Sequence, residues 1–210
     1  MVYLIPKFTI IPIINLWVKK VSGGENLPEE GAAILAANHA SYADHLIIGA
    51  YAATKVNRQV HFLAKKEHFD NFFKKSWHEY VGSIQLDREK KGKKALKLAL
   101  KALKDGKIIG IHPEGTRTLT GKLQQGKTGV ARLALQSRVP VIPIGLTGTF
   151  EMLPKGKYIP KLKKATMNIG KPMFFTQYYN KKPTKKLLRE VTTRIMKEIA
   201  KLSKQKYNFK

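Results

Sequence analysis

Short apolar runs alternate along this chain with segments whose apolar residues recur at helical spacing. The runs have the length of buried strands and lie at Ala33–Ala37, Val60–Ala64, Ser83–Leu86, Ile108–Ile111, Val141–Leu146 and Thr166–Ile169. The segments between them that favour helices are Ala43–Ala53, Gly92–Lys104 and Gly129–Gln136. Such alternation is typical of an α/β domain, so we expect a mostly parallel central sheet flanked by helices.

The C-terminal segment predicts one further helix, and the length of the chain fits one domain. Thr184 follows Pro183 and can cap a helix whose apolar residues recur at helical spacing as far as Leu202. The chain has 210 residues, with neither an internal repeat nor a linker-like stretch that would divide it. That length is enough for a single domain with a buried core.

The first 18 residues are almost entirely apolar, and Lys19 and Lys20 follow them. Two prolines and a lysine interrupt this stretch, which falls short of the ~20 apolar residues that a membrane-spanning helix needs. We therefore expect residues 1–20 to form an arm that lies in the plane of a membrane surface, and residues 21–210 to form the globular domain. The alternative is an arm that packs on the domain and covers its core.

The net charge of the chain is +26, from 40 lysines and arginines against 14 aspartates and glutamates. A field of this sign attracts anionic lipid headgroups, nucleic acid or an acidic carrier protein, and charge alone does not choose among them. Aromatic residues do not interleave with the basic runs as they do on surfaces that stack bases. The absence of cysteine excludes disulfides, thiolate zinc sites and a cysteine acyl-enzyme.

The stretch Asn38–Asp44 follows the first predicted strand and contains candidate groups for proton transfer. His39 and Asp44 are separated by about 500° of helical rotation, so their side chains meet only if a turn precedes the helix. A carboxylate held against the imidazole would fix its tautomer and stabilise the imidazolium formed on proton abstraction. Ser41 fits a turn or helix-cap role better than that of a nucleophile. Taken alone, this spacing also fits a structural histidine.

A second motif, His112–Arg117, follows the predicted strand Ile108–Ile111, and strand ends of this kind commonly carry ligand sites in open α/β sheets. Gly115 permits close backbone approach, and Arg117 can bind a phosphate through two hydrogen bonds. Glu114 can position an acceptor hydroxyl or Arg117 itself. The alternative is a surface turn with an internal pair of opposite charges.

Two further cations stand at the ends of predicted elements. Arg88 follows the strand Ser83–Leu86, and Lys127 precedes the helix that begins at Gly129. Cations that converge on one pocket form a phosphate clamp, whereas each of them separately fits a solvated surface charge.

The ordered set of these motifs resembles the PlsC-type glycerolipid acyltransferases, the 1-acylglycerol-3-phosphate acyltransferase family. The set is far more specific than any one motif. In chain order it comprises Asn38-His39, Ser41, Asp44, Gly82, Ile84, Asp87-Arg88, Pro113-Glu114-Gly115-Thr116-Arg117, Lys127-Thr128-Gly129, Val139-Pro140-Val141-Ile142-Pro143-Ile144, Gly148-Thr149, Leu153-Pro154-Lys155-Gly156 and Ile169-Gly170-Lys171-Pro172. His112 and Gln85 depart from it, since the family more often has aromatic or aliphatic residues there.

The resemblance implies His39 as the general base and Asp44 as its partner. It further implies that a set of substrate-binding residues surrounds the phosphorylated acceptor, namely Arg88, Glu114, Gly115, Thr116, Arg117 and Lys127. The reaction it implies moves a fatty acyl group from a thioester of coenzyme A or acyl carrier protein to lysophosphatidic acid, giving phosphatidic acid. No cofactor or metal is expected, and the order of the motifs disfavours a metal site built from histidines and Asp44.

We expect this enzyme to work on an anionic membrane surface, attached in a monotopic or peripheral way with its catalytic domain on the cytoplasmic side. Acyl carrier protein is an expected partner and nucleic acid is not. One alternative is an acyltransferase for glycerol 3-phosphate or another lysolipid. The others are a catalytically silent membrane-surface protein and a basic nucleic-acid-binding protein, neither of which needs the two motifs.

Overall fold

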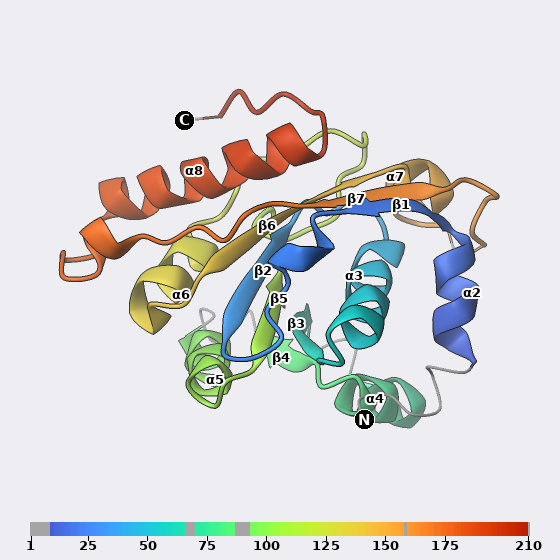
Figure 1. Ribbon diagram of the computed structural model, residues 1–210, viewed down its shortest axis with the longest axis horizontal. Coiled ribbons are helices and arrows are strands. Elements are labelled where there is room, and N and C mark those ends of the chain that lie inside the picture. The colour runs from blue at the N-terminus through green and yellow to red at the C-terminus, as the bar shows by residue number, and fades with distance from the viewer. Residues whose placement is uncertain (1–8, 66–69, 87–92, 158, 210) are drawn as a thin grey trace.

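The computed structural model describes residues 9–65, 70–86, 93–157 and 159–209, which form a seven-stranded sheet between layers of helices (Figure 1). The strands are β1 (Val18–Ser22), β2 (Ala33–Ala37), β3 (Val60–Lys65), β4 (Ile84–Leu86), β5 (Ile108–Ile111), β6 (Val141–Thr147) and β7 (Ala165–Ile169). Their order is β1-β7-β6-β2-β5-β3-β4, and every neighbouring pair is parallel except β6 with β7. The prediction of a mostly parallel sheet flanked by helices is therefore confirmed.

The helices cover both faces of this sheet. They are α2 (Ile10–Leu16), α3 (Ala43–Lys55), α4 (Phe72–Tyr80), α5 (Lys93–Lys104), α6 (Gly129–Ser137), α7 (Thr149–Met152) and α8 (Lys185–Leu202), with single 3-10 turns at η1 (Gly24–Asn26) and η3 (Thr176–Tyr178). In Figure 1, α5, α6 and α8 lie on one side of the sheet, and α2 and α3 lie on the other. Helix α8 begins as predicted, because the Thr184 hydroxyl accepts a hydrogen bond from the N–H of Leu187 at 3.2 Å.

The central strand β2 contributes to both cores at once. Ala33, Leu35 and Ala37 belong to the core shared with α2 and α3. Ile34 and Ala36 point the other way, into the core shared with α5, α6 and α8. All five residues are buried, which explains why their sequence is a continuous apolar run rather than an alternating one.

Neighbouring strands β2 and β5 send their connections to opposite faces of the sheet. The chain leaves β2 into α3 on one face, and it leaves β5 toward α6 on the other. Such a divergence opens a crevice at the carboxyl ends of the two strands, where ligands of open α/β proteins bind. Both motifs of interest, Asn38–Asp44 and His112–Arg117, begin at this point.

The start of the described chain is part of the domain. Strand β1 pairs with β7, so the sheet includes Val18–Lys20, which the prediction placed in the arm. Helix α2 buries Ile11 and Ile14 against the core next to α3, while Ile13 and Leu16 on its other side are 53% and 71% exposed. Among the described residues, no helix has the length and apolar character needed to cross a membrane. The first eight residues of the predicted arm lie outside the described residues.

The contact between β6 and the end of α8 predicts the effect of one substitution. A Cβ added at Gly145 would lie 2.3 Å from backbone atoms of Leu202 and Ser203, so α8 must shift. We expect Gly145→Ala to lower the free energy of unfolding, measured with urea, by about 1–3 kcal/mol. The control is Gly49→Ala in α3, which meets nothing within 4 Å and should stabilise the protein by about 0.5–1 kcal/mol. Equal stability of the two variants would contradict the close packing at Gly145.

Candidate active site

A tight turn between β2 and α3 brings His39 and Asp44 together. The imidazole Nδ1 lies 3.0 Å from Oδ2 of Asp44. The same oxygen accepts hydrogen bonds from the backbone N–H groups of Ala40, at 2.7 Å, and Ser41, at 2.8 Å. The turn that the spacing of these residues requires is thus present, and the aspartate itself holds it.

The environment of this pair favours a neutral imidazole. The contact with Asp44 assigns the Nδ1 proton to that hydrogen bond and leaves Nε2 as an unprotonated acceptor. Burial, together with the smaller effect of the positive charge of Arg117, lowers the pKa of His39 to about 3. Burial also raises the pKa of Asp44, although His112 and the backbone donors oppose this rise. At neutral pH His39 is therefore a free base with an 18% exposed side chain.

The hydroxyl of Ser41 has a structural role in the turn. It donates to the carbonyl of Leu153 at 2.8 Å and accepts from the N–H of Ala43 at 3.0 Å. The residue is completely buried. These contacts agree with the predicted turn role and engage the hydroxyl on both sides.

Asn38 fastens the start of the turn to the neighbouring strand β6. Its amide donates to the carbonyl of Leu146 at 3.0 Å, and its oxygen accepts from the N–H of the same residue at 2.7 Å. The side chain thus imitates the backbone of a paired strand just beyond the end of β2. This contact explains why an asparagine precedes His39.

Glu114 ties the second motif to the first through backbone donors. Its Oε1 accepts from the N–H of His39 at 2.7 Å, and its Oε2 accepts from the N–H of Gln124 at 2.8 Å. The carbonyl of His39 in turn accepts from the N–H of Thr118 at 2.9 Å. Burial raises the pKa of Glu114 to about 7, against the effect of its hydrogen-bond donors. The carboxylate therefore sets the position of the His39 backbone.

Basic side chains lie around the same loop. The guanidinium of Arg117 sits 3.3 Å from the centroid of the Tyr42 ring, and within the described chain its Nη1 is buried without a hydrogen-bond partner. Gly115 has a φ of +71°, and a Cβ there would come within 3.0 Å of the side chain of Lys127. Glycine is thus required for two reasons, namely the positive φ of the backbone and the close packing of the Lys127 side chain.

The structure places most of the predicted site residues in one cluster. His39 and Asp44 lie at its centre, and Thr116 closes the loop by accepting from the side-chain amide of Gln124 at 2.9 Å. Arg88 lies outside the described residues. Within the described chain, no three histidine, aspartate or glutamate side chains are grouped closely enough to hold a metal ion.

His112 is a part of the site whose role the sequence did not reveal. Its ring stacks on that of His39, with centroids 3.9 Å apart and planes 7° from parallel. Its Nδ1 lies 3.1 Å from the carbonyl of Ala37 and 3.0 Å from that of Asn38, so this nitrogen carries the proton. In the sequence His112 is only a departure from the family pattern. The number of residues between two separate motifs does not reveal that two of their side chains stack.

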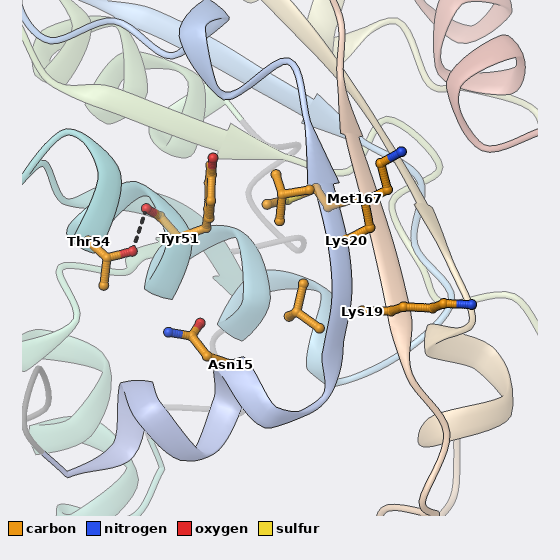
Figure 2. A pocket seen from close by; sticks show the side chains of 8 residues that line it. Asn15, Lys19, Lys20, Tyr51, Thr54 and Met167 are labelled. Carbon is orange, nitrogen blue, oxygen red and sulfur yellow. Dashed lines mark hydrogen bonds between the residues drawn. The ribbon is translucent and has the colours of Figure 1, made fainter.

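A separate hollow lies among α2, α3 and β1 (Figure 2). Asn15, Tyr51 and Thr54 line it, together with Val18, Lys19, Lys20, Val21 and Met167. It adjoins the C-terminal half of α3, whereas Asp44 belongs to the first turn of that helix. The hollow is therefore distinct from the cluster around His39.

Comparison with known proteins identifies the family. The family model described as Acyltransferase matches residues 19–147, which is more than half of the chain. The chain belongs to the acyltransferase family. A 1-acyl-sn-glycerol-3-phosphate acyltransferase of Bacillus subtilis is 30% identical over 87% of this chain and 87% of its own length. A probable 1-acyl-sn-glycerol-3-phosphate acyltransferase of Mycoplasma pneumoniae is 29% identical over 65% of this chain, which spans 52% of that relative.

A solved structure supports the fold of this acyltransferase. The crystal structure of the 1-acyl-sn-glycerophosphate (LPA) acyltransferase PlsC from Thermotoga maritima covers 95% of this chain and 82% of its own, with a TM-score of 0.69 and 24% identity. This acyltransferase thus has the PlsC fold. Together with the relatives, the family match makes it an O-acyltransferase of the 1-acylglycerol-3-phosphate type, as the motifs indicated.

The buried ring of His112 predicts acid sensitivity in this acyltransferase. Burial lowers its pKa from 6.5 to about 3, so the folded state disfavours the proton, and stability is lost as pH falls below 6.5 toward 3. His112→Phe keeps a ring against His39 and removes this titration. Between pH 7 and pH 5 we expect the wild type to lose about 2 kcal/mol more free energy of unfolding than the variant. Urea unfolding at both pH values measures this, and parallel losses would contradict a buried neutral ring.

Proposed function

We propose that this chain transfers a fatty acyl group from an acyl thioester to the free hydroxyl of 1-acylglycerol 3-phosphate, giving phosphatidic acid on a membrane surface. The observation that carries the proposal is the dyad of His39 and Asp44. The imidazole of His39 has an unprotonated Nε2, and it lies close enough to Arg117 to be influenced by its charge. The relatives from Bacillus subtilis and Mycoplasma pneumoniae, which are named as 1-acyl-sn-glycerol-3-phosphate acyltransferases, support this choice of acceptor.

The dyad supplies the proton transfers. Nε2 of His39 takes the proton of the acceptor hydroxyl while the hydroxyl oxygen attacks the thioester carbonyl. Asp44 stabilises the resulting imidazolium through the Nδ1 hydrogen bond. When the C–S bond breaks, the leaving thiolate receives that proton and departs as the free thiol. The transfer is direct, because the chain has no cysteine and the Ser41 hydroxyl is engaged within the turn.

The loop cations bind the phosphate of the acceptor. Arg117 offers a buried Nη1 without a partner in the described chain. The side chain of Lys127 packs against Gly115 of the same loop. Burial is the main reason why the pKa of His39 is low, and the charge of Arg117 adds to it; a phosphate bound there would offset this second contribution. Acceptor binding thereby raises the proton affinity of the base at the moment when it is needed. Arg88 completes the phosphate clamp in this proposal.

Membrane attachment rests on the first described helix and on overall charge. Ile13 and Leu16 of α2 face solvent, and the chain carries a net charge of +26. An apolar helix face with a basic surround is the arrangement that binds anionic membranes in plane. Coenzyme A and acyl carrier protein are both acidic, so the same field attracts either form of the donor.

Two substitutions test the base and the phosphate clamp. In acyl transfer to lysophosphatidic acid in mixed micelles, we expect His39→Ala to lower kcat by about 10²–10⁴-fold, since the general base is lost. Arg117→Lys should raise the KM for the acceptor about tenfold, because lysine cannot form a bidentate hydrogen-bonded contact with the phosphate. The matched control is Arg132→Lys, on the exposed side of α6, which should leave both constants unchanged. Full turnover by His39→Ala would overturn the mechanism.

The same assay tests the acceptor and the expectation of a metal-free reaction. We expect turnover to survive exhaustive EDTA treatment, because the proposed chemistry uses only side chains and the two substrates. Activity that disappears with EDTA and returns with added divalent metal would contradict this. Faster turnover of glycerol 3-phosphate than of lysophosphatidic acid would reassign the acceptor while leaving the dyad in place.

A further inference from the structure

The connection between α7 and β7 carries exposed apolar side chains in a basic surround. Ile159 is 84% exposed and Leu162 is 96% exposed, the highest values among the large hydrophobic residues of the described chain. The lysines of this connection are exposed as well, namely Lys155, Lys157, Lys161, Lys163 and Lys164. No acidic residue occurs between Glu151 and Glu190. We call the described residues of this connection, 154–157 and 159–164, the basic loop.

Both ends of the basic loop are fixed to the domain. At its start, Pro154 forms a bridge with Ser41, and the Ser41 hydroxyl donates to the carbonyl of Leu153. The N–H of Lys161 donates a hydrogen bond to the carbonyl of Met152 at 2.8 Å, which ties this part of the loop to the end of α7. Its two apolar side chains therefore extend from a held segment next to the turn that contains His39.

The other end of the basic loop meets the end of α2. The N–H of Ala165, the first residue of β7, donates to the carbonyl of Trp17 at 2.7 Å. In Figure 1 the connection from α7 to β7 and helix α2 lie on the same side of the molecule. Helix α2, which carries the exposed residues Ile13 and Leu16, thus lies on the same side as the basic loop. Figure 2 shows the ammonium groups of Lys19 and Lys20 extending away from the hollow beside α2.

We propose that the basic loop is a second membrane contact, which inserts Ile159 and Leu162 among lipid acyl chains while its lysines lie at anionic headgroups. This inference rests on the proposed membrane-bound function and deepens it. Exposed apolar side chains surrounded by lysines suit an anionic lipid surface. The apolar side chains can then enter the hydrocarbon layer while the lysines contact the anionic headgroups. Since the loop starts at the Ser41 turn, its insertion brings the partly exposed side chain of His39 toward the layer that holds the acceptor.

Binding to vesicles tests the basic loop directly. The probe is vesicles of phosphatidylcholine with phosphatidylglycerol, compared with phosphatidylcholine alone. We expect the double variant Ile159→Ser/Leu162→Ser to bind the anionic vesicles about tenfold or more weakly than the wild type. The control is Leu98→Ser, an exposed apolar residue of α5 on the other face of the sheet, which should bind as the wild type does. Turnover of a monomeric short-chain lysophosphatidic acid without vesicles should remain unchanged in the double variant, which also reports that it folds.

A fluorescent variant provides a second readout that does not depend on the loss of binding. When anionic vesicles are added, tryptophan emission of Ile159→Trp should shift to shorter wavelength by more than that of the wild type, which contains Trp17 and Trp77, because the added indole enters the apolar layer. Equal vesicle binding by the wild type and the double variant, with no emission shift, would overturn the loop proposal and leave the proposed function standing. Failure of the wild type to bind vesicles would instead overturn the membrane association itself. A raised KM for acyl carrier protein, without a change in vesicle binding, would reassign the loop to the carrier protein and reject the lipid contact.

Discussion

One buried oxygen atom, Oδ2 of Asp44, organises the site by accepting three hydrogen bonds. Two come from backbone N–H groups of the turn and one comes from the imidazole of His39. A buried donor left without a partner costs about 1–3 kcal/mol, so the conformation of the turn and the orientation of the imidazole depend on the same carboxylate. The fold around the site serves this arrangement, since β2 ends where the turn begins and α3 delivers Asp44 in its first turn.

A second carboxylate fixes the distance between His39 and the loop that carries Arg117. Glu114 receives the N–H of His39 on one oxygen and the N–H of Gln124 on the other, while the carbonyl of His39 receives the N–H of Thr118. The loops after β2 and β5 are therefore joined by hydrogen bonds on both sides of His39. Because an interlocked pair of loops moves as one body, a phosphate held by Arg117 would keep its place relative to the imidazole.

Charge is distributed in this protein according to depth. Asp44 and Glu114 are buried and bound to backbone donors, whereas the lysines of the basic loop and α5 are mostly exposed. The outer surface thus presents a positive field, which would attract the anionic donor and lipids of the proposed function, and the interior uses negative charge to orient single groups. The stack of His112 on His39 belongs to the interior part of this scheme, because a flat, uncharged ring packs against the imidazole of His39.

The sequence by itself determined the fold class, the central strands and the order of the motifs. Buried parallel strands are continuous apolar runs, and α3, α5, α6 and α8 repeat apolar residues at helical spacing, so local pattern sufficed. Strand β1 escaped prediction because it lies at the sheet edge and has two exposed lysines, and α7 is only four residues long. Only the tertiary structure decided that Glu114 binds the N–H of His39 and that His112 stacks on its ring. These partners lie more than 70 positions apart, and such contacts arise from how strands are ordered in the sheet rather than from neighbouring residues.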